Sequence, residues 1–224
     1  MTSVISIAKK HFFKITWYIS LIYFTYLMIF ITLQYLPINF EVAFLRIKQA
    51  EIALTHYQYA FFIHVYTSIL VLIAGLTQFS DFIRSKFRAM HRTLGKTYVL
   101  LVLIAASPSG LIMAYYANGG ITSRIGFSIL AVLWFIFTYK AYRYAVRKKW
   151  TLHKNYMYRS YALTLSAISL RLIKWGIVST LALPPITTYR IVAWAGWIIN
   201  LAVIEFYIRR KEMLKSVSTH LEKN

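Results

Sequence analysis

A few charged and polar residues lie inside long apolar stretches of this chain. A charged group near the centre of a bilayer costs at least about 2.5–3.5 kcal/mol, so such a residue is expected to face other helices and a partner. Arg171 lies well inside one stretch, and no acid matches its depth, so it needs an anion, a cluster of carbonyl groups or a water-filled cavity. His64 lies on a stretch of opposite direction at a similar depth, roughly 6 Å to the outer side of the midplane. The two side chains are therefore expected to share an outer-half substrate pocket.

A second pair of intramembrane residues carries opposite charges. Glu205 is the only acid inside any apolar stretch, and Arg159 lies at a matching depth, roughly 10–12 Å to the inner side of the midplane. An unpaired carboxylate there would be costly, so the sequence predicts a structural ion pair. His91 and His153 lie near the inner interface, at the starts of two stretches. The histidines also have plainer interpretations, His64 as a hydrogen-bonded packing residue and the other two as helix caps near lipid phosphates.

Membrane-spanning helices must position these residues. The 224-residue chain is 59% hydrophobic and only 14% charged, with a mean hydropathy of +0.56, whereas a soluble domain has about a quarter of its residues charged. A spanning helix needs roughly 20 mostly apolar residues, and six stretches qualify. They cover about residues 15–37, 57–79, 93–116, 124–146, 155–178 and 188–209. The sequence predicts an all-α integral membrane protein, a six-helix bundle over residues 15–209, with a segment 1–14 before it and a basic tail 210–224 after it.

The basic residues predict the orientation of the bundle. Of the 26 Lys and Arg residues, 20 lie in segments that are cytoplasmic if the N-terminus is inside, and four lie in the opposite segments. This bias places both termini in the cytoplasm and the protein in the inner (cytoplasmic) membrane. The charges are divided among four short segments at helix ends, where anionic lipids of the cytoplasmic side account for them. A nucleic-acid partner is not expected, because such proteins gather basic residues on one folded face.

The sequence excludes several classes of active site. Without cysteine there is no disulfide, thiolate metal site or cysteine nucleophile, and no phosphate-binding glycine loop or HExxH motif is present. The run Ser107-Pro108-Ser109-Gly110 is expected to kink the third helix near mid-membrane and to open space for a cavity.

Three segments carry a resemblance to a known family. They are HRTLGKTY at 91–98, HKNYMYRSYALT at 153–164, and His64 followed by GLTQF at 75–79. Together they resemble the bacterial family of predicted membrane proteins called domain of unknown function 2306 (DUF2306), over roughly residues 55–210. One departure is Tyr156, where the family is associated with tryptophan. The resemblance implies membership of the family and no particular mechanism.

The HRTLG segment is also similar to the histidine–glycine segments of cytochrome b561 and ferric-reductase-like membrane cytochromes. This weaker resemblance implies a b haem between His91 and His153, with Gly95 admitting the ring. The cluster of basic residues that would hold the haem propionates is Arg92, Lys96, Lys154 and Arg159, with Arg92 and Lys154 foremost. A second, outer haem would need a histidine partner for His64 on the fourth helix, and that helix has none.

Three functions remain open from the sequence. The first is a membrane redox protein with an inner b haem that exchanges electrons with a quinone in the His64 and Arg171 pocket. The second is a small proton-coupled transporter, whose path would use these two residues with Arg159 and Glu205. The third is a non-catalytic membrane subunit or assembly factor, in which the polar residues only stabilise the bundle.

Overall fold

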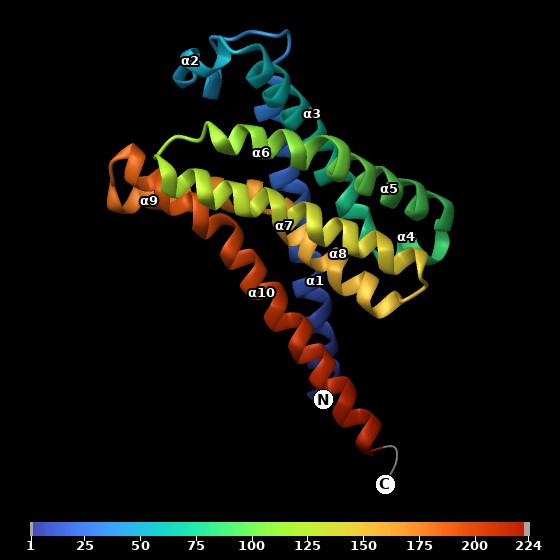
Figure 1. The fold of residues 1–224 in the computed structure, drawn as a ribbon. Helices are drawn as coiled ribbons and strands as arrows, with labels where there is room; N and C mark the ends of the chain where they lie inside the picture. Colours follow the sequence, from blue (N-terminus) through green and yellow to red (C-terminus); the bar gives the residue numbers. More distant parts are fainter. Residues whose placement is uncertain (1, 222–224) are drawn as a thin grey trace.

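The protein is a bundle of long helices. The structure is a computed structural model that describes residues 2–221, apart from the side chains of residues 2–11, 13, 14, 215 and 217–221. Every element in this range is a helix: α1 (Thr2–Leu33), η1 (Ala43–Ile47), α2 (Gln49–Ile52), α3 (Thr55–Gln78), α4 (Asp81–Lys86), α5 (Arg88–Leu101), η2 (Val102–Ala106), α6 (Ser107–Tyr115), α7 (Ile121–Val146), α8 (Trp150–Thr164), α9 (Ser166–Leu181) and α10 (Pro185–Leu221). The start of α1 and the end of α10 lie on the same side of the molecule, opposite α2 (Figure 1).

The described residues contain five helical segments long and apolar enough to cross a membrane. They are 15–33, 55–78, 88–115, 121–146 and 185–214, and the pair α8 and α9 makes a sixth if it is one bent span. The all-helical membrane class expected from the sequence is confirmed. Six straight spans are not found, because the fifth predicted span, 155–178, is broken into two helices that meet at an angle of 41°.

Some helices do not end where the predicted spans end. The first helix ends at Leu33, before the turn that contains Pro37, and it begins at Thr2, inside the segment 1–14. The last helix runs from Pro185 to Leu221, well past residue 209, so most of the basic tail continues the helix. Helices extend beyond the apolar stretch because backbone hydrogen bonding does not depend on hydropathy, which was the only signal used to bound them.

The break between α8 and α9 has a cause in side-chain hydrogen bonds. The Thr164 hydroxyl donates to the Ser160 carbonyl at 3.2 Å, and the Ser166 hydroxyl donates to the Leu163 carbonyl at 2.5 Å. Serine and threonine side chains that bond to the preceding turn bend helices. The sequence carries neither proline nor glycine at this point, so the break had no obvious signal.

The third span accommodates Pro108 through an unusual turn. Residues 102–106 form a π-helical turn directly before Ser107, and the whole segment 88–115 remains one candidate span. Proline lacks an N–H and disturbs the preceding turn of a helix, which a wider turn can absorb. The π turn stands directly before the run 107–110, where a kink was expected. It brings the Ala106 carbonyl and Gly110 against α3.

A cluster of hydroxyl groups lies at the centre of the bundle. The Tyr98 hydroxyl is 2.8 Å from the hydroxyls of both Ser160 and Thr164, and Thr164 also accepts from the Trp134 indole N–H at 3.1 Å. Thr138 joins the cluster through Ser160 at 2.7 Å. All these residues are buried, so their mutual hydrogen bonds satisfy groups that lipid could not. The cluster fixes α5, α7 and α8 relative to one another.

A small cap covers one end of the bundle. It consists of residues 43–54, that is η1, α2 and the turn after them, and Leu45 and Ile52 pack there on Tyr57 and Phe61 of α3. Lys48 is only 1% exposed, and its ammonium group donates to the carboxylate of Glu51 and to the Tyr116 carbonyl. The cap is thereby attached to the end of the third span.

Candidate functional site

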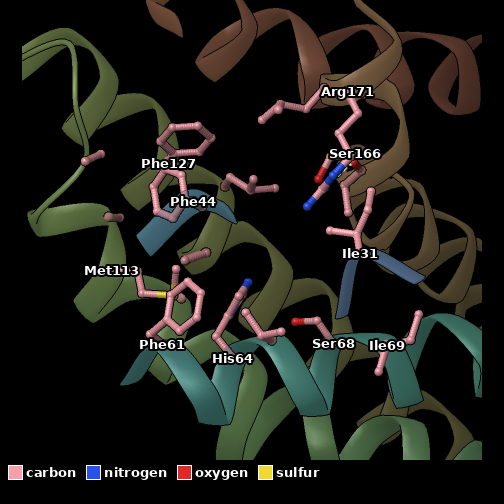
Figure 2. Close-up of a pocket in the computed structure, with 18 of the residues that line it drawn as sticks. Ile31, Phe44, Phe61, His64, Ser68, Ile69, Met113, Phe127, Ser166 and Arg171 are labelled. Atoms are coloured by element: carbon pink, nitrogen blue, oxygen red, sulfur yellow. Dashed lines mark hydrogen bonds between the residues drawn. The ribbon is translucent and has the colours of Figure 1, made fainter. Parts of the chain in front are cut away.

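A cavity of about 400 Å³ lies beneath the cap, among the spanning helices. We call it the His64–Arg171 cavity. Residues from α1, the cap, α3, α6, α7, α8, α9 and α10 line it, and most of them are apolar. Figure 2 shows His64 on α3 and Arg171 on α9 pointing into this space from opposite walls. Its volume lies in the range of about 300–1,000 Å³ that is usual for ligand pockets.

The ring of His64 is held in one orientation. Its Nδ1 is 2.8 Å from the Ala106 carbonyl, which can only accept, so Nδ1 carries a proton. In the neutral ring, Nε2 is then a hydrogen-bond acceptor. Gly110 lets the ring approach α6, because a Cβ at this position would lie 2.9 Å from Cε1 of His64 and 3.0 Å from Nδ1. The third span thus sets both the position and the tautomer of His64.

Arg171 has little to bond with inside the protein. One of its terminal nitrogens donates to the Ala167 carbonyl at 2.7 Å, one turn earlier on α9. A guanidinium has five N–H donors, and within residues 2–221 this is its one protein hydrogen bond and it has no ion pair. The accessible surface of Arg171 is large, and its side chain faces the cavity (Figure 2). The sequence offers Arg171 no acid at a matching depth, and the described residues provide it with only this one hydrogen bond.

The lining of the cavity carries positive charge and no acid. Its charged residues are Lys48, Arg171 and Lys174, and none of the described lining residues is Asp or Glu. Lys48 is neutralised by Glu51 at 2.7 Å, so two cations remain uncompensated. Lys174 lines the cavity one turn after Arg171.

A buried hydroxyl on α3 adds a further polar group. Ser68 lies one turn after His64, lines the cavity, and its oxygen is buried with no hydrogen-bond partner among the described residues. Buried hydroxyls are nearly always hydrogen-bonded. Sequence reasoning missed Ser68 because serine is common in membrane helices. It missed Lys48 because the segment between the first two spans reads as a solvent-exposed loop.

The two histidines predicted for the inner side lie close together, away from this cavity. His91 at the start of α5 and His153 at the start of α8 are near enough for their charges to interact. The Nδ1 of His153 donates to the Ala141 carbonyl at 2.9 Å, which leaves Nε2 available as a metal ligand. Among the described residues, no group of three or more His, Asp or Glu residues could hold a metal ion. A haem with two axial histidines requires only a pair.

Other expected haem contacts differ from the sequence-based interpretation. Gly95 packs on the side-chain amide of Gln78, and a Cβ there would lie 2.9 Å from its oxygen, so the space beside this glycine is filled. Arg159 is engaged elsewhere, as described below. Arg92 is exposed, and Lys154 lies 5.9 Å from the centre of the Tyr158 ring. Lys96 is also exposed, so Arg92, Lys96 and Lys154 are the basic residues of the cluster that remain for propionates.

The structure joins Arg159 and Glu205 in a bidentate ion pair. The Nε of Arg159 donates to one carboxylate oxygen, and a terminal nitrogen donates to the other at 2.9 Å. The guanidinium also stacks over the Tyr156 ring, 5.0 Å from its centre. Their side chains are 19% and 34% exposed, and neither lines the His64–Arg171 cavity. The pair ties α8 to α10, as does the hydrogen bond between Asn155 and Glu212 at 2.8 Å.

Comparison with known proteins gives one match. Residues 61–208 match the family model described as a predicted membrane protein, DUF2306. This range contains every polar site residue singled out from the sequence, and it excludes α1 and the cap. No curated protein and no solved structure matches the chain, so the resemblance to membrane cytochromes has no support from these comparisons.

Proposed function

The chain belongs to the DUF2306 family of predicted membrane proteins, and we propose that it binds a membrane-soluble amphiphilic ligand in the His64–Arg171 cavity. The observation that carries this proposal is the pair of polar groups on opposite walls of one apolar cavity. Each has hydrogen-bonding capacity that the described part of the protein leaves unused.

Unused polar groups inside a membrane are costly. Burying a polar group without a hydrogen bond costs roughly 2–7 kcal/mol by transfer measurements, and a charge costs far more. Residues of this kind in membrane helices usually mark sites for substrates or ions. A ligand with a polar head would satisfy Arg171, and apolar side chains such as Ile31, Phe61 and Met113 would surround its hydrophobic part.

The proposal predicts saturable binding that depends on the cavity. We would purify the protein in a neutral detergent and measure binding of amphiphiles with twelve-carbon chains and different heads by thermal shift and calorimetry. Ser68→Leu fills the cavity while removing a hydroxyl that has no partner, so it should abolish binding and leave the fold intact. Failure of every amphiphile to bind the wild-type protein would refute a ligand-binding function and favour a non-catalytic subunit.

A second candidate function is a membrane redox protein, favoured by the arrangement of the inner histidines. His91 and His153 would hold a b haem as axial ligands, with Arg92 and Lys154 beside the propionates, and a bound haem supplies one-electron transfer. His153 is held ready for this role because its Nδ1 is anchored on a backbone carbonyl. The space beside Gly95, which is filled by Gln78, argues against it.

In the redox interpretation the His64–Arg171 cavity would take a quinone. Arg171 would donate to one carbonyl oxygen, and the neutral His64 ring would accept from a hydroxyl of the reduced form. A reduced-minus-oxidised absorbance spectrum of protein from haem-supplemented cells tests this candidate. Sharp Soret and alpha bands that disappear in His91→Ala and His153→Ala would support it, and a featureless spectrum of folded protein would remove it.

Proton-coupled transport receives no comparable support. Its path was expected to include Arg159 and Glu205, which bond to each other and do not line the cavity.

A further inference from the structure

We infer that the ligand of the His64–Arg171 cavity is an anionic amphiphile, a single-chain carboxylate or phosphate monoester whose head binds Arg171 and Lys174. This inference rests on the proposed function and specifies the chemistry of the ligand. The charge of the cavity lining favours an anionic ligand. Two of its three cations are uncompensated, and no described lining residue is acidic.

The two free cations lie on one face of α9. Arg171 and Lys174 are three residues apart, so their side chains emerge about one turn apart on the same side of the helix, and both line the cavity. A single anionic head can reach both. A neutral ligand such as a quinone or an alcohol would leave both charges uncompensated within the membrane.

The donors of Arg171 match a carboxylate or a phosphate. Its guanidinium uses one nitrogen on the Ala167 carbonyl and retains N–H groups for the ligand. A guanidinium binds two oxygens of a carboxylate or phosphate through parallel hydrogen bonds, which are about twice as strong as those between neutral groups. Lys174 adds a second charge with rotatable donors.

The apolar part of the cavity limits the rest of the ligand. About 400 Å³ is near the lower end of the usual range for ligand pockets, which suits one hydrocarbon chain better than the two chains of a phospholipid. Figure 2 shows Phe61, Met113 and Phe127 on the wall away from Arg171, where such a chain would lie. Each buried methylene stabilises the bound state by about 0.8 kcal/mol, so a chain should contribute strongly to affinity.

Ligands matched in chain and different in head test the inference. We would measure dissociation constants for dodecyl phosphate, dodecanoate, dodecanol and a short-chain ubiquinone, and would also offer inorganic phosphate and acetate. The two anionic amphiphiles are expected to bind tightest. Arg171→Gln should weaken them about tenfold to a hundredfold, the range for losing hydrogen bonds to a charged group, and should leave dodecanol unchanged.

Three further variants make the result specific. Lys174→Gln should weaken the anionic probes by a smaller factor, about threefold or more, because a lysine ammonium forms a single-point contact. Arg171→Lys keeps the charge and should retain part of the binding. Arg124→Gln removes a cation from the same end of the bundle that does not line the cavity, so it should have no effect. If Arg171→Gln does not fold, Lys174→Gln still decides the question.

The contrary outcomes are distinct. Dodecanol or the quinone binding as tightly as dodecyl phosphate would overturn the inference and leave a ligand-binding cavity in place. If inorganic phosphate or acetate bound as tightly as their long-chain counterparts, the inference that the ligand carries a hydrocarbon chain would be overturned. No binding by any probe would overturn the proposed function itself.

Discussion

The contact between Gly110 and His64 gives the sharpest test of how the cavity is built. A methyl group at residue 110 would lie 2.9 Å from Cε1 of His64 and 3.0 Å from Nδ1, closer than carbon atoms approach in folded proteins. The ring cannot move away freely, because Nδ1 is hydrogen-bonded to the Ala106 carbonyl at 2.8 Å. Gly110→Ala should therefore displace the ring and break this bond.

The size of the effect follows from three contributions. Overpacking costs typically about 1–3 kcal/mol, and loss of a hydrogen bond adds about 1 kcal/mol. Replacing a glycine inside a helix by alanine contributes about 0.8–1.0 kcal/mol in the opposite direction. We expect a net loss of about 1–3 kcal/mol in the free energy of unfolding.

Two controls isolate the contact. Gly176 also lies inside a helix, α9, and a Cβ there would meet nothing within 4 Å, so Gly176→Ala should be neutral or slightly stabilising. In a His64→Ala background the obstacle is gone, and Gly110→Ala should then resemble Gly176→Ala. Reversible unfolding in detergent for the four proteins of this double-mutant cycle gives the coupling energy. If Gly110→Ala costs the same with and without His64, the described contact does not exist.

Three further predictions concern the polar groups that hold the helices. Glu205→Gln should lower the free energy of unfolding by about 2 kcal/mol, because it breaks a bidentate charge-assisted pair that is partly exposed. The double variant Arg159→Met with Glu205→Leu should recover much of that loss in the same assay. Additive losses from the two substitutions would contradict a coupled pair. Burial raises the pKa of Glu51, but the hydrogen bond and charge of Lys48 outweigh it, so the pKa lies below its usual value. The stabilisation by the Lys48–Glu51 pair is present above the pKa that Glu51 has in the unfolded state, and it is lost as the pH falls through the lower pKa of the folded state. Hydrogen-exchange protection of the cap should therefore fall between neutral pH and about pH 3. In Glu51→Gln this protection should already be low at neutral pH, and equal protection in both proteins would refute the role of the pair. Tyr98→Phe should cost about 1–2 kcal/mol, since it removes a hydroxyl that bonds two buried partners on α8, and an unchanged melting curve would contradict the cluster.

Hydropathy and charge carried enough information for the class of the protein and for the approximate course of its helices. They could not locate the helix ends, because α1 and α10 continue through polar residues that a helix tolerates outside lipid. They also could not reveal the break at Leu165, since it arises from serine and threonine hydroxyls bonding to their own backbone. The features that depend on burial in lipid could be predicted from the sequence, and those that depend on local hydrogen bonds could not.

The depths of the polar residues in their helices could be predicted from the sequence. Counting residues along the helices matched Arg159 with Glu205, which the structure pairs, and His64 with Arg171, which line one cavity. Such counting gives a position along the membrane normal and nothing about rotation around each helix. It therefore missed that Ser68 and Lys174 face the same cavity, and that Gln78 fills the space beside Gly95. Lys48 was missed because its burial depends on how the cap folds back over α3.

The central claim is that an anionic head binds between Arg171 and Lys174 with its chain inside the bundle. Photo-crosslinking tests it most directly, using a dodecanoate analogue with a diazirine at the chain end and mapping of the adducts by mass spectrometry. We expect adducts on cavity-lining residues of α3 and α6, with labelling suppressed by excess dodecyl phosphate, unaffected by dodecanol and lost in Arg171→Gln. Labelling spread over lipid-facing residues, or competed equally by dodecanol, would contradict it.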